Sequence, residues 1–148
     1  MTRTETTARP KAGSLSLEFD LHHPPEKVWR ALTDPVLLAE WLLPSVGLDL
    51  EPGAAFTFRT QPHPGWDGTV HCRFVEIAPL EKLSYTWAVG DMEIDTVVTF
   101  TLAPTASGTR LSIVQSGFRA DQKHASGGAC YGWKMMGAKL VDLLERMP

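Results

Sequence analysis

Cysteine is scarce in this chain, which has only Cys72 and Cys130 among its 148 residues. Two cysteines cannot build a disulfide framework, and this pair lies too far apart in the sequence for the ligand spacing of a zinc knuckle. His71 adjoins Cys72, but neighbouring residues of a strand point to opposite faces, so the imidazole cannot activate the thiol. We therefore expect no metal site and inert thiols.

Long apolar runs and runs of one charge are also missing. No window approaches the roughly 18 uncharged apolar residues of a membrane-spanning helix, and residues 1–14 lack the apolar segment of a secretion signal. The chain has 14 basic and 17 acidic residues, a net charge of −3, and no cluster of Lys or Arg that could follow a phosphate backbone. We expect a cytoplasmic protein that binds neither membranes nor nucleic acids.

The sequence lacks the motifs of the common catalytic centres as well. It has no dinucleotide-binding glycine loop, no phosphate loop with its lysine, no zinc-protease helix and no nucleophile elbow. The histidines are poorly placed for acid–base chemistry, since His71 is predicted on an outer face and His22 and His23 point to opposite faces. We predict no cofactor and no catalytic residue.

What the sequence does contain is an apolar fraction of 43%, enough for the core of one domain. Residues 1–13 are polar and without periodicity, which predicts a disordered tail before a single domain over 14–148. Apolar residues at 15, 17, 19 and 21 alternate with polar ones, as in a strand with one buried face. The same alternation predicts antiparallel strands at 54–60, 69–77, 83–89, 94–102 and 110–116, and a short one at 46–50.

Helices are predicted on both sides of this series of strands. Pro25 and Pro35 each stand where a short helix can begin, and Pro44 ends the second one. Apolar residues at steps of three and four predict a long amphipathic helix over 126–147. The order of elements indicates an α+β fold, in which a curved antiparallel sheet of six or seven strands wraps around the last helix.

Short motifs along the chain follow the order of a known family. They are PEKVW at 25–29, ALTDP at 31–35, Trp41 with Pro44, VEIAP at 75–79, VTFTL at 98–102, GTRL at 108–111, SGF at 116–118 and YGW at 131–133. Together they resemble the SRPBCC superfamily, which is START-like and birch-pollen-allergen-like, and its branch similar to the activator of the heat-shock protein 90 ATPase. The resemblance implies a helix-grip fold with a cavity for apolar small molecules. No role carries over to His124, because residues 125–128 separate it from Trp133.

Strand alternation gathers mostly aromatic side chains on the inward face of the sheet, opposite residues of the helices and loops. Together with the resemblance, this predicts a cavity for an apolar or aromatic small molecule, lined by Trp41, Phe56, Phe58, Cys72, Phe74, Tyr85, Trp87, Val98, Phe100, Gln115, Phe118, Trp133 and Met136. Tyr85, Gln115 and the Trp87 indole each need a partner in the protein or a ligand. In the alternative, these side chains fill a core and Gln115 reaches solvent.

Three other functions stay open at this point. A cyclase- or hydrolase-type enzyme would use Tyr85 or Gln115 to polarise a carbonyl group. A co-chaperone that binds heat-shock protein 90 is the function implied by the family name. A homodimerising module would need a large exposed apolar patch outside the cavity, and the Thr-, Ser-, Arg- and Glu-rich outer faces argue against one.

Overall fold

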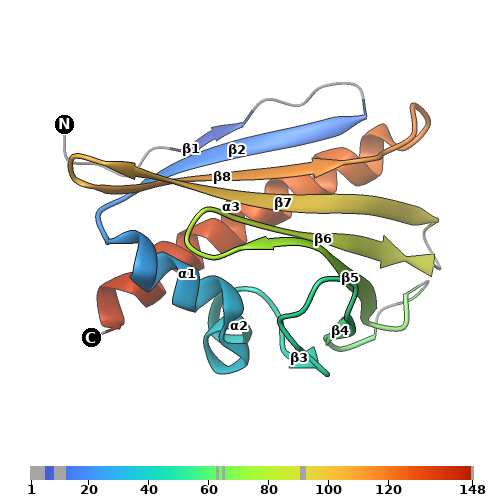
Figure 1. The fold of residues 1–148 in the computed structure, drawn as a ribbon. Helices are drawn as coiled ribbons and strands as arrows, with labels where there is room; N and C mark the ends of the chain where they lie inside the picture. The colour runs from blue at the N-terminus through green and yellow to red at the C-terminus, as the bar shows by residue number, and fades with distance from the viewer. Residues whose placement is uncertain (1–5, 9–12, 63, 65, 91–92, 148) are drawn as a thin grey trace.

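A computed structural model of the chain describes residues 6–8, 13–62, 64, 66–90 and 93–147 (Figure 1). Its strands form one antiparallel sheet in the order β1-β2-β8-β7-β6-β5-β4-β3. In chain order the elements are β1 (Thr6–Ala8), β2 (Ser14–Leu21), α1 (Pro25–Thr33), α2 (Pro35–Trp41), β3 (Ser45–Val46), β4 (Ala55–Arg59), β5 (Thr69–Ala78), β6 (Lys82–Val89), β7 (Ile94–Thr105), β8 (Gly108–Ser116) and α3 (Lys123–Arg146). The predicted α+β helix-grip fold is confirmed.

The two short helices begin at prolines, as the sequence predicts. Pro25 occupies the first turn of α1, where its missing N–H leaves no hydrogen bond unmade. Asp34 separates the helices and caps α2, because its Oδ1 accepts a hydrogen bond from the Val36 backbone N–H at 2.9 Å. Their inward residues join the core, where Trp41 Nε1 donates to the Ala31 carbonyl at 2.9 Å.

Several boundaries differ from the sequence prediction; β7, for example, runs to Thr105 instead of 102. The short strand ends at Val46 instead of spanning 46–50, since Gly47 turns the chain with a φ of +74°. The last helix begins at Lys123, three residues before the predicted Ser126, because the glycines at 127 and 128 hide its apolar periodicity. Within the predicted tail, Thr6–Ala8 pair with Leu17–Phe19 as β1, and the other residues before Gly13 lie outside the described part.

The long helix α3 runs along one face of the sheet, with its C-terminal end beside α1 (Figure 1). Its backbone comes close to β2, α2 and α1. The close approach depends on Gly137, where an added Cβ would lie 2.2 Å from Phe19 Cζ. Large side chains lie between α3 and β4–β6, where the Trp87 and Trp133 ring centroids are 5.5 Å apart. In the described part of the chain, no helix is long and apolar enough to cross a membrane.

Candidate functional site

The predicted site residues lie together between the sheet and α3. Trp87 and Met136 are half-buried, and the others are buried: Trp41, Phe56, Phe58, Cys72, Phe74, Tyr85, Val98, Phe100, Gln115, Phe118 and Trp133. Strand alternation therefore predicted the inward direction of the members that lie on strands. The structure also buries Thr96, which sequence reasoning missed although it precedes the inward Val98 by two residues.

Tyr85 occupies the centre of the aromatic side chains on β4–β7. Its ring centroid lies 5.3 Å from Phe56, 5.7 Å from Phe74 and 5.8 Å from Phe100. The Phe56 and Phe74 rings meet it at 75° and 86°, the edge-to-face geometry that aromatic pairs favour. The phenol is therefore held by rings on several sides.

Helices α2 and α3 each contribute one tryptophan to the same cluster of rings. Trp133 of α3 lies 5.5 Å from Trp87 and 5.8 Å from Phe100, measured between ring centroids. Trp41 of α2 meets Phe100 at 6.4 Å and 82°. These rings thus join the sheet to both helices. Below, the region around the rings of Trp41, Phe56, Phe58, Phe74, Tyr85, Trp87, Phe100 and Trp133 is called the aromatic interior.

Gln115 is the centre of a buried chain of hydrogen bonds. It is 2% exposed, so the expected alternative in which it reaches solvent is wrong. Its Oε1 accepts from Trp133 Nε1 at 2.9 Å, and its Nε2 donates to Thr96 Oγ1 at 2.9 Å. Thr96 in turn donates to the Trp87 carbonyl at 2.8 Å. The amide therefore links β8, β7 and β6 to α3 through partners that the protein itself supplies.

Burial controls the titration of the two ionisable groups in the aromatic interior. It raises the pKa of Tyr85 well above the ordinary value for a phenol, and the nearby Cys72 adds to the shift. Burial also raises the pKa of the Cys72 thiol. Both groups therefore stay protonated at neutral pH, and the thiol is inert, as the sequence predicts. No Asp, Glu, Lys, Arg or His belongs to the buried set of the described residues.

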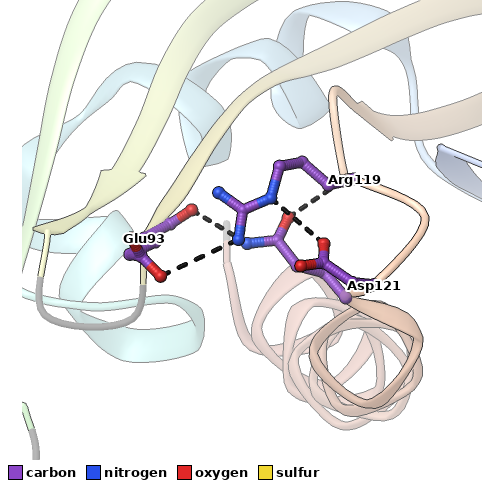
Figure 2. Close-up of polar contacts among 4 residues, drawn as sticks. Glu93, Arg119 and Asp121 are labelled. Carbon is purple, nitrogen blue, oxygen red and sulfur yellow. Dashed lines mark hydrogen bonds and ion pairs between the residues drawn. The ribbon is translucent and has the colours of Figure 1, made fainter.

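A polar cluster fixes the beginning of α3 to the residue that precedes β7 (Figure 2). Gln122 is 8% exposed; its Nε2 donates to the Glu93 carbonyl at 2.8 Å, and its Oε1 accepts from the Arg119 N–H at 2.9 Å. Arg119 also places Nε 3.1 Å from Asp121 Oδ1 and Nη2 3.8 Å from Glu93 Oε2. The hydrogen bond from Arg119 lowers the pKa of the Asp121 carboxyl.

The histidines named in the sequence analysis lie outside the aromatic interior. His71 is exposed on the outer face, where it borders a hollow of about 400 Å³ with Arg73 and Thr86. His22 is exposed, and His23 is half-buried at the end of β2. His23 Nδ1 lies 3.3 Å from Lys27 Nζ and its Nε2 3.8 Å from Glu145 Oε1. Sequence patterns gave no sign of this contact with α3.

Known proteins share the fold of this chain. Residues 22–145 match the family described as activator of Hsp90 ATPase homolog 1-like protein. The crystal structure of MLL2253 from Mesorhizobium loti is 40% identical, with a TM-score of 0.84 over 91% of this chain and 98% of its own. CV1439 from Chromobacterium violaceum is 30% identical, with a TM-score of 0.74 over 90% and 97% of the two chains. CalU16 from Micromonospora echinospora, at 21% identity and a TM-score of 0.78, covers 97% of this chain and 87% of its own and shares the fold. No curated protein matches the chain.

Proposed function

This chain belongs to the family of activator of Hsp90 ATPase homolog 1-like proteins, and we propose that it binds an apolar or aromatic small molecule in the aromatic interior. The observation that carries this proposal is the composition of that interior. Rings from the sheet, α2 and α3 face one another there, and none of the buried side chains of the described residues is charged. Sites for apolar ligands have this composition, with few polar groups that fix orientation.

Binding is better supported than catalysis. General acid–base chemistry needs a group whose pKa lies near the working pH, placed within hydrogen-bond reach of the substrate. Tyr85 and Cys72 have pKa values raised by burial and hold their protons at neutral pH. Gln115 is already committed to Trp133 and Thr96. The residues of the aromatic interior can therefore hold and orient a molecule, but none of them can act as a general base.

Substitution at Cys72 tests this proposal, because the thiol lies beside the rings and is 4% exposed. A panel of neutral hydrophobic compounds is screened for a rise in the melting temperature of the wild-type protein. We expect Cys72→Trp to fold and to lose these rises, since an indole then occupies the ligand's space. His71→Trp is the matched control, because it adds the same indole at the neighbouring residue on the outer face. The compounds should still raise the melting temperature of His71→Trp.

Two results together would contradict ligand binding. One is a panel in which no compound raises the melting temperature of the wild-type protein. The other is a Cys72→Trp protein that fails to fold while His71→Trp folds normally. This combination would show that the aromatic rings form a filled core with no room for a further molecule.

A further inference from the structure

Among the fully buried Tyr, Trp and Gln side chains of the aromatic interior, Tyr85 differs from the rest, and the half-buried Trp87 indole likewise has no hydrogen-bond partner among the described residues. Trp41 Nε1 donates to the Ala31 carbonyl, and Trp133 Nε1 donates to Gln115. Gln115 in turn donates to Thr96. Within the described residues, the Tyr85 hydroxyl makes no hydrogen bond, although the side chain is 2% exposed. A phenol that is removed from water normally finds a partner.

The Tyr85 hydroxyl is deeply buried but not sealed off completely. In the described part of the chain, Ser45 Oγ is the one completely enclosed side-chain N or O atom that lacks a hydrogen-bond partner. The Tyr85 oxygen also lacks one, so it keeps a trace of accessible surface and an unused hydrogen-bonding capacity. Its ring is held by Phe56, Phe74 and Phe100, which set the direction of the C–O bond. The oxygen is thus a fixed polar point among aromatic rings.

The Tyr85 hydroxyl favours an uncharged hydrogen-bond acceptor on the ligand. The phenol keeps its proton, since burial raises its pKa, so it is a hydrogen-bond donor. A carboxylate or phosphate on the ligand would lose its hydration without gaining a cation, because no Lys, Arg or His is buried among the described residues. An uncharged acceptor, such as a ketone or ether oxygen, has no such cost.

We propose that Tyr85 determines the specificity of this site: its hydroxyl donates a hydrogen bond to an uncharged carbonyl or ether oxygen of an otherwise apolar, aromatic ligand. The inference rests on the proposed function and names the class of molecule that the aromatic interior takes. Tyr85 orients the ligand and forms no covalent bond with it.

Three probes with the same two phenyl rings test this proposal. Diphenylmethane has no acceptor, benzophenone adds a carbonyl, and diphenylacetate adds a carboxylate. Affinities are measured by isothermal titration for the wild-type protein, Tyr85→Phe and Tyr131→Phe. Tyr131 is the only other tyrosine and is 67% exposed, so Tyr131→Phe makes the same chemical change outside the site.

We expect Tyr85→Phe to weaken benzophenone binding by about three- to tenfold, the usual worth of one hydrogen bond. Diphenylmethane affinity should stay unchanged, diphenylacetate should bind weakest to the wild-type protein, and Tyr131→Phe should match the wild type. The infrared carbonyl stretch of bound benzophenone should lie at lower frequency in the wild-type protein than in Tyr85→Phe. A general loss of packing would not move that band in this way.

The results separate this inference from the proposed function. If the probes bind but Tyr85→Phe changes neither the benzophenone affinity nor its carbonyl band, the role of Tyr85 is overturned and binding stands. The same holds if Tyr85→Phe weakens benzophenone and diphenylmethane equally. If none of the probes binds to the wild-type protein, the proposed function fails and the role of Tyr85 fails with it.

Discussion

At the scale of single residues, burial decides what each polar group of the interior can do. Gln115 lies among apolar side chains, where an unpaired amide would be costly, and both ends of its amide are paired. Such a group stabilises the fold only while all its partners are present. Tyr85 has no such partner in the described residues, and the ligand proposed above would supply one.

Gln115→Leu should lower the free energy of unfolding by about 2–3 kcal/mol, because Trp133 Nε1 is left buried without an acceptor and Thr96 loses a donor. Equilibrium unfolding in urea measures the change. The control is Gln61→Leu, the same substitution at an exposed position, which should stay within about 0.5 kcal/mol of the wild type. Equal stability of the two variants would show that the hydrogen-bond chain contributes nothing.

The sequence predicts the inward direction of Gln115 but not its partners. Alternation from Leu111 and Ile113 fixes the face of the sheet on which the amide lies. Its contacts depend on the register between β7 and β8, in which Val98 pairs with Gln115, and on the rotation of α3. Neither quantity is encoded in a local pattern. The sequence thus identified a buried amide and left open whether the protein or a ligand satisfies it.

At the scale of elements, the glycines of α3 serve different purposes. A Cβ at Gly137 would overlap the Phe19 ring, whereas a Cβ at Gly127 or Gly128 would meet nothing within 4 Å. Glycine in a helix interior costs about 1 kcal/mol relative to alanine. Gly137 offsets that cost by letting α3 approach β2, and Gly127 and Gly128 leave the first turns of α3 intrinsically weak.

Two alanine substitutions in α3 should therefore have opposite effects. Gly137→Ala should destabilise the protein by about 1–3 kcal/mol through overpacking against Phe19. Gly128→Ala should stabilise it by about 0.5–1 kcal/mol through helix propensity alone. Thermal unfolding of both variants under identical conditions provides the comparison. A Gly137→Ala protein as stable as Gly128→Ala would contradict the close packing of α3 on β2.

These glycines also explain which part of α3 was predicted. The apolar steps at Trp133, Met136 and Leu140 identify the helix and its buried stripe. The glycines interrupt that stripe toward the N-terminal end, so the sequence placed the start three residues late. The hydrogen bonds of Gln122 to Glu93 and Arg119 fix that start, and the one to Glu93 joins residues 29 apart in the chain.

At the scale of the whole molecule, His23 connects the two ends of the domain. It follows β2, lies 3.3 Å from Lys27 of α1 and reaches Glu145 near the end of α3. Burial of the ring and then the charge of Lys27 lower the pKa of His23 below its usual 6.5, and Glu145 acts in the opposite direction. The unfolded chain therefore takes up this proton at a higher pH than the folded protein does.

Acidification should therefore reduce stability through His23. The contribution of the neutral ring is complete above the unfolded pKa and is lost progressively as the pH falls below about 6.5. Urea unfolding at several values between about pH 7.5 and 5.5 measures how the free energy of unfolding changes with pH. His23→Asn should make this dependence on pH weaker. His22→Asn, at the exposed neighbouring position, is the control. Identical slopes for the wild-type protein and His23→Asn would contradict this assignment.

The order of elements and the inward faces of the strands were predictable, because both follow from periodicity and from proline and glycine positions. The packing between α3 and the sheet was not. It depends on how closely α3 approaches β2 at Gly137 and on how the rings around Tyr85 pack against one another. The same inward residues are compatible with a filled core or with a ligand site, so their sequence pattern does not separate the two.

Native mass spectrometry of the freshly purified protein, beside its mass after denaturation, tests the central claim most directly because it assumes no particular ligand. The account predicts a non-covalent adduct that leaves on denaturation and is depleted in Cys72→Trp. A released compound that is uncharged and carries a carbonyl or ether oxygen would agree with the role of Tyr85. A wild-type protein that carries no adduct and takes up none when exposed to a lysate extract of neutral apolar compounds would contradict the claim.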